Sequence, residues 1–339
     1  MTLKSAIANS LILAIILVAS VVAMEFTVRA LFPVYDPSGQ LEFRAGTNDV
    51  PTLGIPNKQF RQRKNTGDYD VSVTFNRYGL RDDKDLATST PDDFFVVGDS
   101  FSIGWGVAAK DRYSNRLQAL TGRRSFNIST PGDFDNYRDL INYAVKNGAP
   151  VKNLIVGVCM ENDLADYDAA KSIGDKGVGF SLLTLKGWLT KKSALYVMAT
   201  AVTHTTPALK DAAVRLGLIT PNLAGVPQNR YSQNIVTSSV KRLVSLMAGM
   251  RATVLIIPSR SLWVGGQRKA ADRTHKEFIK LAREAGLDIV DPRQRFEASG
   301  APLSYHFDND GHWNARGHAV AAKALSQFLK TRNKAERKK

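Results

Sequence analysis

The sequence predicts an α/β fold: a central parallel sheet with helices on both faces, preceded by one N-terminal transmembrane helix. Three observations predict it. Short apolar runs without alternation end abruptly at glycine or polar turns, as strands do when both faces of their sheet are covered. Segments with helical spacing follow these runs, and alternating strands and helices favour a parallel sheet. The third observation is an almost uninterrupted apolar stretch near the start of the chain.

The elements can be assigned in order along the chain. Buried strands are expected at residues 94–97, 124–128, 154–158, 253–257 and 288–290. Helices are expected at residues 113–120, 137–146, 231–250, 269–285 and 314–329. With 339 residues, 44% of them hydrophobic and 23% charged, the chain suits one large domain, or a domain with a modest insertion.

Irregular segments precede and interrupt the main domain, which we place at residues 93–330. Residues 31–92 are rich in proline, glycine and charge, and are expected to be a lead-in packed on the domain, with a short strand near 71–75. A helical insertion is expected at about residues 164–230. It contains a glycine-rich loop at 174–179 and helices at 182–189 and 194–216, the second broken near Pro207.

Large side chains in this insertion can be interpreted in three ways. They could form a cap over a site, a small core of their own, or a surface that faces a membrane. We favour the small core. The residues concerned are Trp188, Leu189, Leu195, Tyr196 and Met198.

Residues 6–24 are nearly all apolar and approach the roughly 20 residues that a helix needs to cross a bilayer. Lys4 and the amino terminus are positive before this stretch, whereas Glu25 and Arg29 balance each other after it. That asymmetry favours a cytoplasmic N-terminus and a translocated, periplasmic or extracytoplasmic domain. We therefore favour a membrane anchor over residues 1–30. A cleaved signal peptide and a buried soluble helix remain as alternatives.

Charge and cysteine content limit the partners. The single cysteine, Cys159, excludes an intramolecular disulfide and a multi-cysteine metal site. The net charge of +15 favours anionic neighbours, such as phospholipid or acidic polysaccharide. Part of this charge lies in the basic tail, residues 331–339, which we expect to be solvated. No zinc-finger or RNA-binding motif accompanies the charge, so no nucleic acid is expected. Oligomeric state is not predicted.

Polar residues follow three of the predicted strands, at the sheet edge where functional groups of parallel sheets gather. Ser100 follows a buried strand in a turn that leads to a helix, which presents its hydroxyl and leaves its backbone N–H free. Gly132 follows the next strand and lets the backbone approach a ligand closely. Asn162 follows a third strand, and its amide is suited to stabilise an oxyanion. Each of these residues, taken alone, is equally typical of a plain turn.

A histidine near the C-terminus completes the set. A nucleophilic serine needs an imidazole within hydrogen-bond reach, and that imidazole needs a group to orient it. His312 lies in an acidic loop that opens the last helix, with Asp308 and Asp310 just before it. The other histidines are interpreted as surface or satisfied interior residues: His204, His275, His306 and His318.

In this order, the blocks resemble those of the SGNH hydrolase superfamily, also called GDSL-type esterases, in its membrane-anchored bacterial branch. The matching segments are residues 98–102, Gly132, 161–163 and 310–317, with further similarity at 76–81 and 104–107. The resemblance implies a flavodoxin-like three-layer α/β/α sandwich. It also implies Ser100 as nucleophile and His312 as general base. The oxyanion hole would comprise the backbone N–H groups of Ser100 and Gly132 and the Asn162 side chain.

One position departs from the family pattern. Much of the family carries the orienting aspartate three residues before the histidine, where this chain has Asn309. We favour Asp310, two residues before, because a similar arrangement occurs in related exopolysaccharide O-acetyltransferases. Asp308 or the carbonyl of Asn309 could take this role instead.

These residues predict a serine-dependent acyl-ester hydrolase or O-acyltransferase that needs no metal and no cofactor. We expect its substrate to be an O-acylated carbohydrate outside the cytoplasm. A lipase or phospholipase is an alternative, and so is an inactive, membrane-anchored polysaccharide-binding protein. A dinucleotide-binding protein is excluded, because residues 104–106 lack the third glycine of that motif and no P-loop occurs.

Overall fold

The structure, a computed structural model, describes residues 3–38, 40–47, 50–168, 182–218 and 232–336. The chain divides into two compact units. Unit 1 comprises Met1–Gln40, Arg63–Gly67 and Ile173–Ile219, and unit 2 comprises Leu41–Gln62, Asp68–Ser172 and Thr220–Lys339. The predicted glycine-rich loop at residues 174–179 lies outside the described residues.

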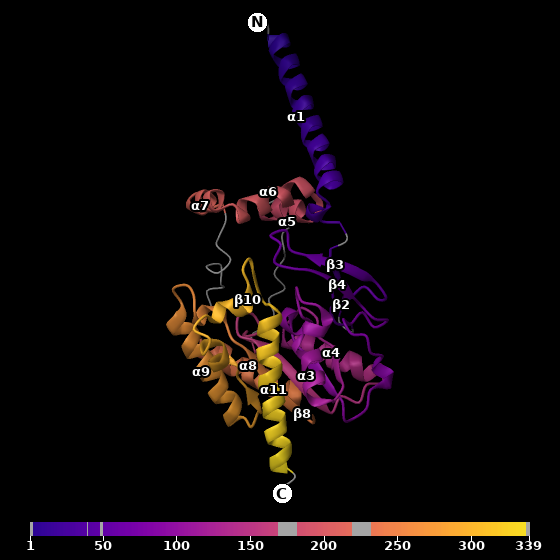
Figure 1. Ribbon diagram of the computed structural model, residues 1–339, viewed down its shortest axis with the longest axis vertical. Coiled ribbons are helices and arrows are strands. Elements are labelled where there is room, and N and C mark those ends of the chain that lie inside the picture. The colour runs from indigo at the N-terminus through magenta and orange to yellow at the C-terminus, as the bar shows by residue number, and fades with distance from the viewer. Residues whose placement is uncertain (1–2, 39, 48–49, 169–181, 219–231, 337–339) are drawn as a thin grey trace. The chain divides into compact units, whose positions relative to one another are not determined.

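Within the described residues, unit 2 is built around a five-stranded parallel sheet (Figure 1). Its strands are β5 (Phe94–Val97), β6 (Ser125–Asn127), β7 (Asn153–Cys159), β8 (Arg251–Ile257) and β9 (Ile289–Val290). Their spatial order, β6-β5-β7-β8-β9, corresponds to 2-1-3-4-5 counted along the chain. This is the order of flavodoxin-like doubly wound sheets, so the predicted fold class is confirmed.

Helices cover both faces of this sheet, and the side chains of each strand alternate between them. Phe94 and Val96 join the core on one face, and Phe95 and Val97 join the core on the other. Of the helices named below, α3 and α11 cover the first face, and α4, α8 and α9 cover the second. The alternation follows from the two-residue period of a strand. The helices are α3 (Tyr113–Thr121), α4 (Phe134–Lys146), α8 (Gln233–Met247), α9 (Arg268–Glu284) and α11 (Ala315–Glu336).

Near the C-terminus the structure differs from the prediction in two ways. Helix α11 ends at Glu336, beyond the predicted end at residue 329, because no glycine or proline interrupts the good helix formers of the basic tail. The predicted loop before it contains an antiparallel hairpin of β10 (His306–Phe307) and β11 (Asp310–Trp313). Two short helices were also not predicted: α2 (Ser100–Ile103) and α10 (Arg293–Glu297).

The lead-in is more ordered than its composition indicates. Strand β1 (Phe43–Arg44) pairs with β2 (Leu53–Gly54), and β3 (Gln59–Arg63) forms a second small sheet with β4 (Asp70–Thr74). Its apolar side chains form a separate core that includes Ile103 of α2. The lead-in therefore packs directly on the helix that begins at Ser100.

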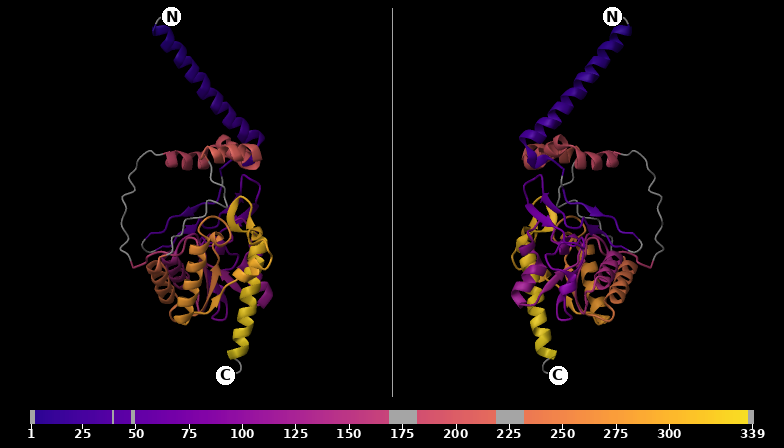
Figure 2. Two further views of the ribbon diagram at one scale, coloured as in Figure 1. Left: turned by 90° about the vertical axis from the view of Figure 1, so that its left-hand side faces the viewer. Right: turned by 90° about the vertical axis from the view of Figure 1, so that its right-hand side faces the viewer.

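Unit 1 consists mainly of helices (Figure 2). They are α1 (Leu3–Leu31), α5 (Leu182–Lys192), α6 (Ala194–Thr205) and α7 (Pro207–Arg215). The predicted break near Pro207 is present, since α7 begins at this proline, a position where the missing N–H costs no helical hydrogen bond. Residues 9–31 of α1 are long and apolar enough to cross a membrane, with a mean hydropathy of 2.6 over the most apolar window.

Candidate active site

Strand β5 and helix α2 place Ser100 at the carboxyl edge of the sheet. The strand ends at Val97, and Asp99 then caps α2 by accepting a hydrogen bond from the backbone N–H of Phe101 at 2.9 Å. Ser100 is consequently the first residue of the helix. Its side chain lies at the surface between the buried strand and the helix, which is the position that the sequence predicted.

The structure brings Ser100, His312 and Asp310 together. His312 Nε2 lies 2.8 Å from Ser100 Oγ, and His312 Nδ1 lies 2.5 Å from Asp310 Oδ1. Strand β11 explains the spacing, because residues two apart in a strand project from the same face. The family pattern, with the aspartate three residues before the histidine, would place the two partners on opposite faces of a strand. Neither Asp308 nor Asn309 hydrogen-bonds to the imidazole within the described residues.

Asp310 is also held by a residue of the lead-in, Tyr69, which the sequence analysis did not identify. Tyr69 donates its hydroxyl proton to Asp310 Oδ2 at 3.1 Å and accepts a hydrogen bond from Trp105 Nε1 at 2.8 Å. Burial and the charge of Asp310 both raise the pKa of Tyr69, so the hydroxyl stays protonated. The ring of Trp105 stacks on His312, with centroids 5.5 Å apart and planes at 24°. Asp68 adds a contact by accepting the backbone N–H of Asn309 at 2.9 Å.

The lead-in also holds the turn that carries Trp105. Arg81, which is buried, donates to the carbonyl oxygens of Ile103, Gly104 and Val107. Burial, with the charge of Arg112 nearby, lowers the pKa of Arg81 to about 9, which still leaves the guanidinium protonated at neutral pH. These bonds satisfy carbonyl groups at the C-terminal end of α2, which have no partner within the helix, and in the turn that follows it.

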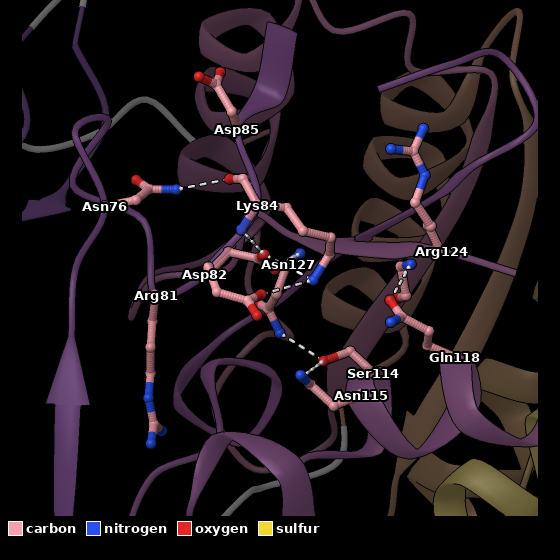
Figure 3. A network of polar contacts seen from close by, with 12 residues as sticks. Asn76, Arg81, Asp82, Lys84, Asp85, Ser114, Asn115, Gln118, Arg124 and Asn127 are labelled. Atoms are coloured by element: carbon pink, nitrogen blue, oxygen red, sulfur yellow. Dashed lines mark hydrogen bonds and ion pairs between the residues drawn. The ribbon is translucent and has the colours of Figure 1, made fainter. Parts of the chain in front are cut away.

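Asp82, the next residue, ties the lead-in to the sheet (Figure 3). It accepts the backbone N–H of Asn127 at 2.7 Å and the backbone N–H of Lys84 at 2.9 Å. The Asn127 side chain in turn donates to Ser114 Oγ and to the carbonyl oxygen of Ser102 in α2. Figure 3 shows Arg81 pointing away from this network, so the two neighbouring residues brace different parts of the site.

The predicted oxyanion residues lie in loops that follow β6 and β7. Gly132 packs against Asn136, whose side-chain atoms lie as close as 2.5 Å to the place that a Cβ would occupy, so a larger residue does not fit. Asn162 donates one amide hydrogen to Asp99 Oδ2 at 3.3 Å. Within the described residues the other amide hydrogen has no acceptor. The amide therefore lies next to the residue that precedes Ser100.

Two buried carboxyl groups lie beneath these loops. Asp163 accepts the hydroxyl of Tyr137 at 3.0 Å and the backbone N–H of Cys159 at 2.7 Å, and thereby fixes the end of β7 next to Asn162. Burial and the charge of Asp99 raise the pKa of Asp163 well above its usual range. Burial likewise raises the pKa of Asp99, although the charge of His312 opposes this shift.

A buried ion pair lies beside the hairpin and was not predicted as a pair. Arg260 donates through Nη2 to Glu161 Oε2 at 2.8 Å and through Nε to Oε1 at 3.0 Å. Its guanidinium packs on Gly311, where an added Cβ would lie only 2.5 Å from the guanidinium carbon. Burial lowers the pKa of Arg260, but Glu161 and the nearby Asp310 raise it by more. A signal existed for Glu161, which belongs to the third block, but none for Arg260.

Within the described residues, none of the other histidines hydrogen-bonds to Ser100. They were predicted to be surface or satisfied interior residues, and His306 departs from this, because neither of its ring nitrogens has a hydrogen-bond partner in the part of the chain that the structure describes. His275 is buried and contacts Asp291 at 2.9 Å, and His318 is buried where its Nδ1 accepts the backbone N–H of Tyr113 at 3.3 Å. His306 is also buried, on the strand that pairs with β11. His204 belongs to α6 of unit 1.

Comparison with known protein families adds to this geometry. Residues 233–339 match the family described as "SGNH hydrolase-like domain, acetyltransferase AlgX". This segment includes Asp310 and His312, so the match confirms the resemblance to the SGNH hydrolase superfamily that the sequence blocks predicted. No curated protein matches the chain.

Solved structures with a similar fold include esterases and a transferase, all of low sequence identity. A lipase/acylhydrolase from Enterococcus faecalis is 13% identical, with a TM-score of 0.40, covering 71% of this chain and 96% of that one. A mutant of the acetylxylan esterase Axe2 from Geobacillus stearothermophilus is 12% identical, with a TM-score of 0.38 and coverages of 72% and 96%. The catalytic domain of peptidoglycan O-acetyltransferase A from Streptococcus pneumoniae is 9% identical, with a TM-score of 0.36 and coverages of 71% and 93%.

Proposed function

We propose that this protein is a serine-dependent acyl-ester hydrolase or O-acyltransferase that acts on O-acylated carbohydrate. One observation carries the proposal: Ser100 Oγ, the His312 imidazole and the Asp310 carboxylate lie in one continuous hydrogen-bonded line, at 2.8 Å and 2.5 Å. This arrangement lets the imidazole accept the serine proton while the carboxylate stabilises the imidazolium that forms. A protein that only binds polysaccharide does not need a serine hydrogen-bonded to a histidine and an aspartate in this way.

The first half of the reaction forms an acyl-enzyme. Ser100 Oγ attacks the carbonyl carbon of the ester, and its proton moves to His312 Nε2. The tetrahedral intermediate then collapses, the bond to the leaving oxygen breaks, and that oxygen takes the proton from His312. In the second half, water or a sugar hydroxyl gives its proton to His312 and attacks the acyl carbon. The bond between that carbon and Ser100 Oγ then breaks, and Ser100 Oγ takes the proton back from His312. Water yields hydrolysis, whereas a sugar hydroxyl yields transfer.

Negative charge on the carbonyl oxygen is stabilised by three donors in this proposal. They are the backbone N–H groups of Ser100 and Gly132 and the side-chain amide of Asn162. The free amide hydrogen of Asn162 and the tight packing at Gly132 support these assignments. Fixed donors of this kind require no reorganisation when the charge develops.

The family description supports acetyl as the transferred group, and the net charge of +15 supports an acidic polysaccharide as substrate or acceptor. We also propose that α1 anchors the chain in a membrane, with the N-terminus in the cytoplasm and unit 2 outside it. The length and hydropathy of residues 9–31, and the positive charge before the apolar stretch, support this anchor.

Turnover of p-nitrophenyl acetate by the full-length protein and by Ser100→Ala, both in lipid nanodiscs, tests the mechanism. In serine proteases, loss of the activated serine lowers kcat by about a million-fold. We therefore expect turnover of Ser100→Ala to fall to the background rate. A fluorophosphonate probe should label the wild type and not the variant. Equal rates, with both proteins folded by circular dichroism, would exclude Ser100 as nucleophile and leave the binding protein as the better interpretation.

Adding an oligosaccharide acceptor separates transfer from hydrolysis. Acetylated oligosaccharide that forms only with active protein supports a transferase, and release of acetate alone supports an esterase. A series of p-nitrophenyl esters of increasing chain length tests the lipase alternative. Preference for acetate supports the carbohydrate substrate, whereas preference for long chains would support a lipase.

A further inference from the structure

The end of α1 is joined to the start of α6 by charged hydrogen bonds. Glu25 accepts the backbone N–H groups of Ala194 and Leu195 at 2.8 Å and 3.0 Å, and the hydroxyl of Ser193 at 2.8 Å. Arg29, one turn further, donates to the carbonyl oxygen of Lys192 at the end of α5. A carboxylate at one helix N-terminus and a guanidinium at another C-terminus both match the helix dipoles. These contacts fix the junction of α5 and α6 to the last turns of α1.

This junction lies at the depth where a membrane-spanning α1 would leave the hydrocarbon. The apolar residues 6–24 would extend about 28 Å as a helix, and the hydrocarbon core of a bilayer is roughly 30 Å thick. Glu25 directly follows this stretch. A helix N-terminus within hydrogen-bond distance of Glu25 therefore lies in the headgroup region.

Helices α5, α6 and α7 lie crosswise to α1 (Figures 1 and 2). Their buried residues are small or medium, such as Ala194, Val197, Ala201 and Ala213. Several large apolar side chains on these helices, or just after α7, are instead exposed, whereas those of Leu189, Leu195, Tyr196 and Met198 are half-buried. Exposure reaches 58% for Trp188, 47% for Leu209 and 73% for Leu216. Helices that face water place polar residues there, so this pattern indicates an apolar neighbour.

Basic residues accompany these apolar ones. Helices α5 and α7 contain Lys186, Lys191, Lys192, Lys210 and Arg215, against a single acidic residue, Asp211. Their positive charge acts on His204 in α6. Burial lowers the pKa of His204, and the charges of Lys210 and Lys186 on these helices, together with Lys64, lower it further. Tryptophan and lysine beside exposed leucine are typical of helices that lie in a membrane interface.

We propose that α5–α7 form an interfacial platform, in which the exposed apolar side chains enter the outer part of the bilayer and the basic side chains bind anionic phospholipid headgroups. The platform rests on the proposed anchoring role of α1 but not on the chemistry at Ser100. It gives the membrane-facing interpretation of this segment a defined partner. The residues that carry it are Trp188, Val202, Leu209, Leu216 and Leu218, with the basic residues of α5 and α7.

Depth-dependent fluorescence quenching tests the platform in the full-length protein. The protein's own Cys159 is buried, so a single introduced cysteine can be labelled with an environment-sensitive fluorophore. We would compare Leu209→Cys with Asp211→Cys, which is exposed on the same helix but lies roughly 200° around it. A third variant, Val18→Cys, reports on the middle of α1. Each is reconstituted in vesicles of phosphatidylcholine with phosphatidylglycerol, with nitroxides either near the headgroups or deep in the acyl chains.

We expect headgroup-level nitroxides to quench the label at position 209 severalfold more than the label at position 211, and deep nitroxides to quench the label at position 18. Equal quenching at 209 and 211, with strong quenching at 18, would overturn the platform while leaving the anchor intact. No quenching at 18 would overturn the anchor, and the platform with it. Replacing phosphatidylglycerol by phosphatidylcholine should weaken the quenching at 209, and unchanged quenching would overturn the role of the basic residues.

Discussion

The loops at the carboxyl ends of the strands and the lead-in of residues 41–85 contribute to the same site in different ways. The strand ends supply the groups that would meet the substrate, namely Ser100, Gly132 and Asn162. The lead-in supplies groups that hold other parts of the site in place: Tyr69 contacts Asp310, and Arg81 contacts the turn after α2. The proposed nucleophile and oxyanion donors therefore follow strands of the central sheet, whereas the lead-in orients Asp310 and the turn that carries Trp105.

This difference shows how a site can tolerate a shifted aspartate. Asp310 lies on a two-stranded hairpin outside the central sheet, so its orientation depends on contacts from other parts of the chain. The hydroxyl of Tyr69 and the backbone N–H of His312 fix its two oxygens, so that one remains aligned with His312 Nδ1. Orientation of the imidazole thus depends on the lead-in as well as on the hairpin.

The largest effect expected within this comparison is that of Asp310→Asn, measured against Asp308→Asn. The asparagine can place its amide N–H against Nδ1 of His312. The imidazole proton then stays on Nε2, the tautomer that cannot accept the proton of Ser100. In the serine protease triad this change lowers kcat by about 10,000-fold, and we expect a loss of that order here. Asp308 is exposed and makes no hydrogen bond to the imidazole, so Asp308→Asn should retain nearly full turnover of p-nitrophenyl acetate. The reverse ranking would show that Asp308 orients the histidine.

Asn162→Ala tests the strand-end side of the comparison. Removing one oxyanion donor lowers kcat by about 100- to 1000-fold in related chemistry, and KM should change little because the bond forms mainly in the transition state. The substitution also removes the contact with Asp99, so the thermal midpoint is measured in parallel. A loss of kcat below about threefold, with the fold intact, would remove Asn162 from the oxyanion hole.

Tyr69→Phe tests the lead-in side and should have a smaller effect. A hydrogen bond to a charged group contributes about 1.5–3 kcal/mol, which corresponds to roughly 10- to 100-fold in rate if all of it is lost in the transition state. We expect about a tenfold loss in kcat with KM unchanged, because Tyr69 orients Asp310 and does not meet the substrate. Tyr167→Phe removes a comparable hydroxyl, which donates to the carbonyl oxygen of Asp163 at 2.6 Å.

Measuring both thermal stability and kcat shows whether Tyr69 positions Asp310 or only packs in the fold. If Tyr69 only stabilises the fold, both tyrosine variants should lose thermal stability alike and keep the same kcat. A selective fall in kcat for Tyr69→Phe supports its role in holding Asp310.

The sequence predicted the residues in the loops at the strand ends well, and it predicted the contacts of the lead-in and the hairpin poorly. Strands β5 and β7 are apolar runs that end in polar turns, so local pattern was enough to predict Ser100 and Asn162 at one edge of the sheet. Strand β6 is mostly polar, and Gly132 was predicted at this edge from its place after that strand. Tyr69 and Arg260 act across long distances in the chain, and nothing in their neighbours marks them. Arg81 ends the segment 76–81 that resembles the family, but this pattern does not reveal which carbonyl groups it binds. The hairpin was predicted as a loop because strands as short as β10 and β11 show no periodicity.

The C-terminal helix provides a last contrast, since His318 supports the fold without joining the chemistry. Burial lowers the pKa of His318 to about 3, and that of His306 also to about 3. The unfolded chain binds a proton at each near pH 6.5, whereas the folded chain does not. Folding stability is therefore fully present above that pH and is lost as the pH falls toward 3, by about 1.4 kcal/mol per pH unit for each histidine. Urea unfolding between pH 4.5 and 6.5 should show a slope of stability against pH that is smaller in His318→Gln by this amount, and an unchanged slope would mean that the histidine is protonated inside the fold.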